Sequence, residues 1–297
     1  MAAAKGDNFL FDTVAIAGVG LIGGSLGMAA KKKRLARRVV GIGRSEQKLM
    51  RAKILGAIDD YSMDFENGAS DADLVIICTP VRMIVRTLKR IAASLKEGAV
   101  VTDAGSTKRE IVREAGKVMP KGRYFVGGHP MAGSEQAGVE NASADLFVGA
   151  TYVVTHAKGT NLGALGAITA FAEGIGARVE VMTPEVHDLC VAVISHLPHV
   201  LSGTLLQVAE DAQRQTDKLF RLAAGSFRDL TRISESPPEI WQDICATNAD
   251  FLIEVIGRLQ GQLADIKVAL MTGDEAAIAR FFEEARAIRQ AYLRLAK

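Results

Sequence analysis

The sequence of 297 residues contains few cysteines, prolines and aromatic residues, and its charges nearly cancel. Its three cysteines are far apart and show no CxxC spacing, which argues against a disulfide framework or a zinc cluster and is typical of a reducing compartment. The net charge of +2 provides no general field that would attract nucleic acid or an anionic membrane. The start, MAAAKGDNFLFD, lacks the pattern of a signal peptide, and we find no uninterrupted apolar stretch of membrane-spanning length. We therefore expect a soluble, cytoplasmic protein that binds neither nucleic acid nor membranes.

One stretch departs from this charge balance. The segment KKKRLARR, Lys31 to Arg38, is strongly basic. Cations in the last turn of a helix are stabilised by the negative end of the helix dipole, so we favour a solvated helix end here over nucleic-acid binding.

Glycine is unevenly distributed, since 24 of the 29 glycines precede residue 183. In that part, short apolar runs bounded by turn residues alternate with segments of helical period, which predicts an α/β domain with a parallel sheet. Most of the runs are apolar on both faces, as strands covered by helices require. The predicted strands are TVAIAG, RVVGIG, DLVIICTP, GAVVTDAG, YFVGGHP, TYVVT and ARVEVMTP.

After residue 183 the glycines become scarce and apolar residues recur at helical spacing, which predicts an all-helical region. Thr183 can cap the first helix, and Pro184 fits its first turn. We expect two domains, an α/β domain over residues 1–182 and an all-helical domain over 183–297. The segment 239–271 is apolar on more than one side, so we expect a second subunit to cover it in a homodimer.

The stretch VAIAGVGLIGGSLG has three glycines in G-x-G-x-x-G register between a predicted strand and a predicted helix. The first glycine permits a tight turn, the second lets a pyrophosphate approach the backbone, and the third allows close packing of the helix. The N-terminus of that helix attracts the anion. We therefore predict that residues 1–182 form a Rossmann dinucleotide-binding domain, and we favour this over a bare glycine turn. The predicted cofactor contacts in this loop are Gly18, Gly20, Leu21, Ile22 and Gly23.

The end of the second predicted strand bears on which dinucleotide binds. NAD-binding domains carry an acidic residue there, about 20 positions after the motif, for the ribose hydroxyls. Here Gly43 occupies that place, and Arg44 and Ser45, which follow it, can neutralise and hydrogen-bond a 2′-phosphate. We therefore favour NADP over NAD. Glu46 leaves NAD open, because it could reach back to the ribose.

Three loops follow predicted strands at their C-terminal ends, where open α/β sheets bind ligands. They are CTPV at 78–81, DAGSTKRE at 103–110 and GGHPMAGSE at 127–135. We expect them to converge beside the nicotinamide. Ser106 and Thr107 can either cap the following helix or contact substrate, and the sequence leaves both open. The predicted cofactor contacts in the first loop are Thr79, Pro80 and Val81.

In this order, the motifs GxGxxG, DAGS-K, GHPMAGSE, SHLPH and FRDLTRI resemble those of prephenate and arogenate dehydrogenases over nearly the whole chain. The glycine motif is weakly specific, whereas GHPMAGSE together with FRDLTRISESPPEIW is quite specific. The resemblance implies oxidative decarboxylation of a cyclohexadienol with NADP or NAD. Its products would be 4-hydroxyphenylpyruvate from prephenate or tyrosine from arogenate.

The resemblance also implies roles for matching residues. His129 matches the general base, and an imidazole with an ordinary pKa of about 6.5 accepts a proton at neutral pH. Ser106 matches the serine that hydrogen-bonds the same substrate hydroxyl. Arg232 matches the residue that binds the substrate carboxylate, for which a planar guanidinium is suited. Glu135 matches an acid that can pair with this arginine and gate the site, with a plain surface glutamate as the alternative.

Three further histidines, His187, His196 and His199, match family histidines near the substrate, and metal binding is the rival interpretation. On an uninterrupted helix His187 and His196 would lie on opposite faces, and Pro198 interrupts the hydrogen-bond ladder beside them, so we predict no metal site. We expect a bend at the proline that directs His196 and His199 into the cleft between the domains. Trp241 is expected to fill core.

Two other functions share features of this sequence. A β-hydroxyacid dehydrogenase shares the architecture but generally uses a lysine in the helical part, where Lys218, Lys267 and Lys297 lie outside any site-like motif. A non-catalytic NADP-binding sensor is disfavoured because the base, the serine and the arginine are all present. The sequence leaves open whether prephenate or arogenate is the substrate, although NADP use slightly favours arogenate.

Overall fold

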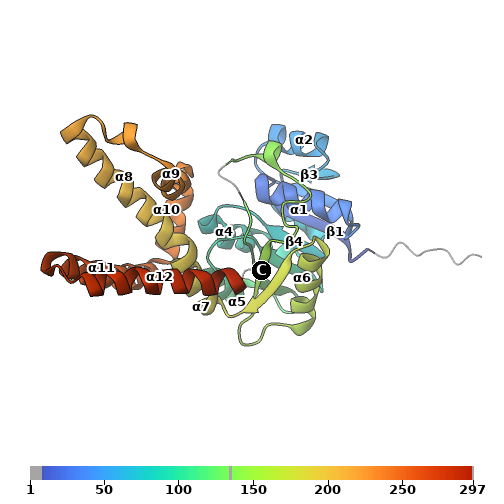
Figure 1. The fold of residues 1–297 in the computed structure, drawn as a ribbon. Coiled ribbons are helices and arrows are strands. Elements are labelled where there is room, and N and C mark those ends of the chain that lie inside the picture. Colours follow the sequence, from blue (N-terminus) through green and yellow to red (C-terminus); the bar gives the residue numbers. More distant parts are fainter. Residues whose placement is uncertain (1–8, 134–135, 296–297) are drawn as a thin grey trace, which may run out of the picture. The chain divides into compact units, whose positions relative to one another are not determined.

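The computed structural model describes residues 9–133 and 136–295. Contacts divide the chain into two units, Met1–Asn248 and Ala249–Lys297. The first unit contains a sheet with its helices, followed by further helices, and the second contains α11 (Ala249–Thr272) and α12 (Glu275–Leu295) (Figure 1). The change from strands to helices near residue 183 lies inside the first unit, and the domain boundary at 182/183 stays a prediction.

A sheet of eight strands forms the centre of the first unit, in the order β3-β2-β1-β4-β5-β6-β7-β8. All seven predicted strands are present, and β3 is added, which at three residues is too short to show a pattern in the sequence. The strands are β1 (Phe11–Ala17), β2 (Ala36–Ile42), β3 (Asp60–Ser62), β4 (Leu74–Ile77), β5 (Val100–Asp103), β6 (Tyr124–Pro130), β7 (Thr151–Thr155) and β8 (Arg178–Met182).

The prediction of a purely parallel sheet is wrong at one place, because β6 and β7 pair antiparallel. A parallel neighbour needs a crossover connection, usually a helix. In the described part of the connection between these strands, 131–133 and 136–150, the only helical segment is the short 3-10 turn η2 (Val139–Asn141). The chain therefore reverses after β6.

Two apolar cores lie on opposite faces of the sheet, as the alternation of side chains along a strand requires. One core contains Ile16 and Ile76 with residues of α1 and α6, and the other contains Val75 and Ile77 with residues of α4 and α5. Helices on both faces explain why these strands are apolar throughout. The helices of the sheet region are α1 (Leu21–Lys32), α2 (Glu46–Ile54), α3 (Phe65–Ser70), α4 (Val81–Ile91), α5 (Arg109–Val118) and α6 (Leu162–Gly174), with a 3-10 turn η1 (Ala92–Ser94).

The basic segment 31–38 is a helix end only in its first half, because Arg37 and Arg38 lie in β2. Lys31 and Lys32 lie in the last turn of α1. Several of its cations pair with carboxylates, so much of its charge is compensated locally. These ion pairs are Lys31–Asp59, Lys32–Asp145, Arg37–Asp12 and Arg38–Asp60.

The helices after the sheet begin where the sequence predicts, since the Thr183 hydroxyl accepts a hydrogen bond from the Val186 N–H at 3.4 Å. A π-helical turn joins α7 and α8 into one helix of 33 residues, Pro184–Thr216, which is apolar and long enough to cross a membrane by length and composition only. The sequence alone had led us to expect no apolar stretch of that length. The elements here are α7 (Pro184–Val191), η3 (Ala192–His196), α8 (Leu197–Thr216), η4 (Leu219–Leu222), α9 (Gly225–Thr231), η5 (Arg232–Glu235) and α10 (Pro238–Thr247).

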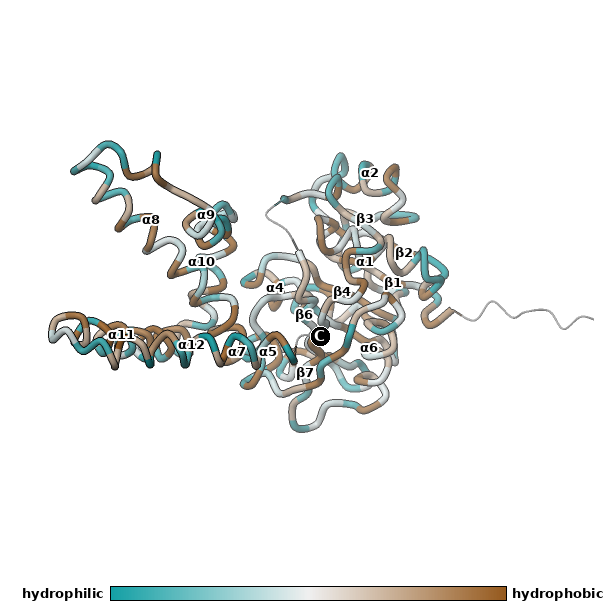
Figure 2. The backbone as a smooth tube through the Cα atoms, viewed as in Figure 1, coloured by the Kyte–Doolittle hydropathy of each residue, from teal (hydrophilic) through white to brown (hydrophobic). Residues whose placement is uncertain are grey.

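Large apolar side chains are exposed on several helices. Figure 2 shows apolar residues along α8, α11 and α12. Val208 is 61% exposed, Ile253 69% and Phe282 63%. Such surfaces on a folded chain are typical of protein interfaces.

Candidate active site

The glycine loop between β1 and α1 has the three properties that dinucleotide binding requires. Gly18 has a φ of +97°, and a Cβ there would lie 2.8 Å from the carbonyl oxygen of Cys78. A Cβ on Gly23 would overlap the carbonyl oxygen of Gly18, whereas one on Gly20 would meet none of the described atoms within 4 Å. The first and third glycines are therefore needed for the turn and for packing, and the second faces open space.

Two further features fit a bound dinucleotide. In the first turn of α1 there is neither an acidic residue nor a side-chain cap, so the backbone N–H groups there can bind an anion. The Thr79 hydroxyl, in the loop after β4 and next to Gly18, is buried and has no hydrogen-bond partner among the described atoms. A buried hydroxyl normally has a partner, and a cofactor in this loop could supply it.

The residues predicted to contact the adenosine ribose of a dinucleotide follow the end of β2. Arg44 is exposed, and Ser45 caps α2 by accepting a hydrogen bond from the Lys48 N–H at 3.4 Å. The Tyr61 hydroxyl donates to the Glu46 carboxylate at 3.2 Å. Glu46 is thus held by β3, which weakens the alternative that it reaches back to a ribose.

His129 lies at the end of β6 and belongs to a hydrogen-bonded chain of three side chains. Its Nδ1 lies 2.8 Å from Nε2 of His187, and Nδ1 of His187 lies 2.7 Å from Oδ1 of Asp188. The Asp188 carboxylate also accepts hydrogen bonds from the N–H groups of Lys108 at 2.7 Å and Arg109 at 2.9 Å. The chain thus ends on the first residues of α5.

This chain fixes which nitrogen of His129 can act as a base. A carboxylate only accepts, so Nδ1 of His187 carries the proton, and its Nε2 then accepts from Nδ1 of His129. The remaining lone pair is on Nε2 of His129. Both ring nitrogens of His187 are used within the protein, and its side chain is only 1% exposed.

Burial keeps these histidines neutral. The pKa of His129 is lowered well below 6.5 by burial and, to a smaller extent, by His187, Lys108 and His196. Burial also lowers the pKa of His187. At Asp188, burial raises the pKa, but hydrogen bonds from His187 and from backbone N–H groups outweigh it and leave the pKa below its usual value. A neutral His129 can accept a proton, and the Asp188 carboxylate acts on it only through His187.

The loop after β5 shows that neither Ser106 nor Thr107 caps α5, so the capping alternative is wrong. The Thr107 hydroxyl lies 2.9 Å from the Thr247 hydroxyl, and the N-cap of α5 is Lys108, without a side-chain cap of its own. The carboxylate of Asp188 satisfies the first N–H groups of this helix instead. Ser106 is partly buried in the same loop.

His196 and His199 lie on either side of the junction between η3 and α8. His196 is 1% exposed, and its Nδ1 lies 3.2 Å from Nδ2 of Asn248. His199 bonds the Ser195 carbonyl oxygen at 2.9 Å and stacks on Trp241, with ring centroids 3.4 Å apart. Trp241 is thus an aromatic partner of this histidine rather than simple core.

The helix is interrupted here, so His187 and His196 need not lie on opposite faces as they would on a regular α-helix. The π-helical turn η3, just before Pro198, shifts the register, and His187 and His196 are both buried. Each is close enough that its charge would lower the pKa of His129. Among the described residues, no group of three His, Cys, Asp or Glu side chains is arranged to hold a metal ion.

The remaining predicted residues come from other elements. Arg232 is exposed at the start of η5. Glu135 lies outside the described residues. The structure therefore joins His129 to His187 by a hydrogen bond, with His196 near enough to affect the pKa of His129, and it places Ser106 and Arg232 on separate segments.

Sequence reasoning missed Asp188, Lys108, Asp103 and Asn248, all of which are fully buried. Lysine and aspartate are almost never fully buried unless they are paired. Lys108 stood within the motif DAGS-K, and Asp188 directly follows His187. The sequence did place a charged residue next to a predicted site residue in both cases. One sequence does not show that these charged residues are buried, and burial is what marks them as part of the site.

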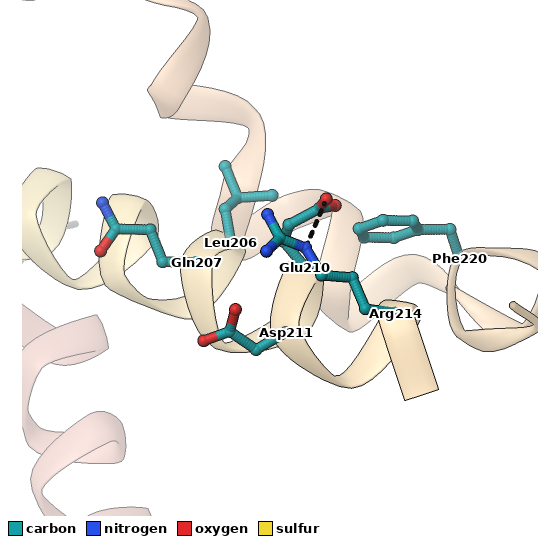
Figure 3. A pocket seen from close by; sticks show the side chains of 6 residues that line it. All are labelled: Leu206, Gln207, Glu210, Asp211, Arg214 and Phe220. Carbon is teal, nitrogen blue, oxygen red and sulfur yellow. Dashed lines mark hydrogen bonds and ion pairs between the residues drawn. The ribbon is translucent and has the colours of Figure 1, made fainter. Parts of the chain in front are cut away.

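An open depression of about 400 Å³ lies elsewhere on the chain, on α8 and η4 (Figure 3). An ion pair between Arg214 and Glu210 at 3.4 Å crosses it. It holds no residue of the glycine loop or of the histidine chain. The lining residues are Leu206, Gln207, Glu210, Asp211, Arg214 and Phe220.

The chain matches two models of known protein families, which together span most of its length. Residues 26–181 match the nucleotide-binding domain of prephenate dehydrogenase, and residues 183–284 match its dimerization domain. The chain is 36% identical to prephenate dehydrogenase of Bacillus subtilis over 280 residues, covering 94% of this chain and 76% of the relative. It is 32% identical to cyclohexadienyl dehydrogenase of Zymomonas mobilis, covering 95% and 96%.

Solved structures agree with the sequence comparison. Prephenate dehydrogenase from A. aeolicus, in complex with hydroxyphenyl propionate and NAD+, superimposes with a TM-score of 0.88 at 30% identity, covering 95% of this chain and 98% of that one. Arogenate dehydrogenase from Synechocystis gives a TM-score of 0.83 at 28% identity, covering 94% and 99%. A 3-hydroxyisobutyrate dehydrogenase from Salmonella typhimurium is only 12% identical, with a TM-score of 0.56, and shares the fold alone. The chain thus belongs to the prephenate dehydrogenase family of NAD(P)-dependent oxidoreductases.

Proposed function

We propose that this protein catalyses the NADP-dependent oxidative decarboxylation of prephenate or arogenate, giving 4-hydroxyphenylpyruvate or tyrosine. The observation that carries this proposal is the chain from His129 through His187 to Asp188, with successive distances of 2.8 and 2.7 Å. It presents one neutral imidazole nitrogen at the carboxyl end of a strand, where such sheets bind ligands.

Nε2 of His129 accepts the proton of the C4 hydroxyl. The C4 hydrogen leaves with its electron pair as hydride, for which a bound nicotinamide supplies the acceptor. The electron pair of the bond to the ring carboxylate then enters the ring as carbon dioxide departs. The oxygen at C4 takes a proton back, and the ring is aromatic.

The structure changes the role that we assign to His187. Its two nitrogens are occupied by His129 and Asp188, so we propose that it orients the base rather than binds substrate. We assign the substrate contacts to the residues that match substrate-binding residues of the family. Ser106 donates to the C4 hydroxyl, Arg232 holds a carboxylate through two parallel bonds, and His196 and His199 line the substrate.

Glu135 completes this arrangement as a gate that pairs with Arg232. This part of the proposal rests on the resemblance alone. Loss of substrate discrimination in Glu135→Gln, with kcat retained, would support it, and kinetics identical to the parent would reject it.

We propose NADP as the preferred cofactor. Arg44 is exposed at the end of β2, where it can meet a 2′-phosphate, and Glu46, the acid that could compete for NAD, is held by Tyr61. Arg44→Ala should raise the KM for NADP about tenfold or more and leave that for NAD unchanged, since a charge-assisted hydrogen bond contributes roughly 1.5–3 kcal/mol. A parent enzyme that prefers NAD would reject this assignment.

We further propose a cytoplasmic homodimer in which helices from residue 183 onward form the interface and bind substrate. The exposed apolar side chains of α8, α11 and α12 support this, because water would otherwise contact them. Light scattering after size exclusion should give twice the mass of the chain. A stable monomer, or partition into membranes, would reject it.

The activity is tested by absorbance at 340 nm with prephenate or arogenate and either cofactor. Reduced nicotinamide with at least one pair supports the proposal, and the ratio of kcat/KM for the two substrates sets the preference. No reduced nicotinamide with any pair, despite cofactor binding, would favour the alternative of a non-catalytic sensor.

A further inference from the structure

Strand β6, which carries His129, stops pairing with β5 before β6 itself ends. The ladder between β5 and β6 ends at the pair Thr102 and Val126. From Gly127 onward, β6 pairs with β7 instead. The N–H and carbonyl of Gly128, the residue before His129, are therefore beyond the β5 ladder, and buried backbone groups need other partners.

Two side chains supply those partners. The carboxylate of Asp103 accepts a hydrogen bond from the Gly128 N–H at 3.2 Å, and Nζ of Lys108 donates to the Gly128 carbonyl oxygen at 2.8 Å. Lys108 and Asp103 also pair directly with each other, and both side chains are 0% exposed. The Asp103 carboxylate additionally accepts from the Gly105 N–H at 2.8 Å, which fixes the loop that carries Ser106.

The glycine pair before His129 is required by what lies against it. A Cβ on Gly127 would overlap the Thr155 hydroxyl. A Cβ on Gly128 would lie 2.7 Å from the carbonyl oxygen of Asp103 and 2.9 Å from the hydroxyl of Tyr152. The backbone before the base is thus confined by packing as well as held by the ion pair.

A buried ion pair is weak as a device for stability, because removing two charges from water costs about as much as their attraction returns. Here the pair binds both groups of a single residue, adjacent to the base. We propose that Lys108 is a positioning residue, which together with Asp103 clamps Gly128 and so holds His129 in the orientation that the reaction needs. This inference rests on the proposed function, in which His129 is the base.

Several charged or titratable groups surround His129, and each bears on a test by pH. His187 on α7 contacts it directly, with Asp188 behind, and His196 approaches from η3. Lys108 and Asp103 lie on the side of β5. The positive charge of Lys108 contributes to the lowering of the His129 pKa, so its removal should raise that pKa.

The test uses the full-length enzyme with the pair neutralised together, Asp103→Asn with Lys108→Met, because the lysine change alone would leave a buried carboxylate without its partner. We expect kcat to fall at least tenfold with the KM for the cofactor unchanged. The acidic limb of kcat/KM against pH should move to higher pH. A purely structural pair would lower the melting temperature but leave the kcat of the folded enzyme as in the parent, and that result would overturn the proposal.

Lys108→Arg is the second variant, in case the double change prevents folding. It keeps the charge beside Asp103 but changes the reach to Gly128, so kcat should fall while the fold persists; a parental kcat in this variant would also overturn the proposal. The control neutralises the surface pair of Arg90 and Glu66, 2.9 Å apart, by Arg90→Met with Glu66→Gln, and should change nothing.

Failure of the proposed function is distinguishable from failure of this inference. If the parent enzyme forms no reduced nicotinamide with either substrate, the function is wrong, and NMR of the imidazoles then tests the clamp alone. Broadened or shifted His129 signals in the double variant, but not in the surface control, support the clamp. Unchanged signals contradict it.

Discussion

His187→Leu removes the middle of the hydrogen-bonded chain that, in the proposed function, orients His129 as the base. Leucine fits the volume but cannot accept a hydrogen bond, so Nδ1–H of His129 loses its partner at 2.8 Å. Asp188 keeps its bonds to the N–H groups of Lys108 and Arg109, and α5 stays capped. The change therefore isolates the orientation of His129 from the stability of the fold.

The size of the effect follows from the orphaned donor. A buried N–H without a partner costs about 1–3 kcal/mol, and the imidazole escapes this cost by turning or by moving its proton to Nε2. Either response removes the base from the reaction. Because about 1.4 kcal/mol corresponds to a tenfold change in rate, kcat should fall roughly 5- to 160-fold, while the KM for either cofactor stays within about twofold.

The assay is steady-state reduction of the cofactor at saturating substrate, with His187→Gln as the matched variant. The amide oxygen of glutamine can accept from His129, so this variant should keep kcat within about tenfold of the parent. Leucine and glutamine variants with the same kcat, both near that of the parent, would refute the orientation of His129 by His187.

Three further outcomes are expected. Burial lowers the pKa of His196 to about 4, below its unfolded value near 6.5. The free energy of unfolding that depends on a neutral His196 is therefore fully present above pH 6.5 and is lost as pH falls toward 4. Thermal melts should show the free energy of unfolding falling by about 3 kcal/mol over that window, and His196→Gln should show a smaller fall. Gly20→Val should weaken cofactor binding, measured by fluorescence, with little change in melting temperature, whereas Gly23→Ala should lower the melting temperature. Arg232→Lys loses the bidentate contact and should raise the substrate KM about tenfold with a smaller effect on kcat.

The sequence predicted the fold well because the governing patterns are local. Apolar runs, the spacing of Gly18, Gly20 and Gly23, and the Thr183 cap each depend on neighbouring residues, and the structure has them where expected. The antiparallel pairing of β7 was missed, because strand direction depends on how the chain returns rather than on the strand itself.

The site was predicted only in part, for a related reason. His129 is conspicuous in sequence as a histidine at a strand end. Its partner His187 is 58 positions away, and Lys108 is 20 positions from the neighbouring Gly128 that it binds, so only folding brings these residues together. The π-helical turn before Pro198 is also invisible to a periodicity of 3.6 residues, and the argument that placed His187 and His196 on opposite faces assumed that period.

The glycine pair in GGHP and the lysine in DAGSTK now have one explanation. A base is useful only if one nitrogen is free and correctly aimed, so the protein must occupy the other nitrogen and fix the backbone. His187 does the first, since its Nε2 occupies Nδ1 of His129, and the ion pair of Lys108 and Asp103 does the second through Gly128. The two sets of contacts come from different elements, α7 for His187 and the end of β5 with the start of α5 for the ion pair, and a Cβ at Gly128 would lie only 2.7 Å from the carbonyl oxygen of Asp103. Under the proposed role of His129, the glycines serve its chemistry as well as the turn that follows it.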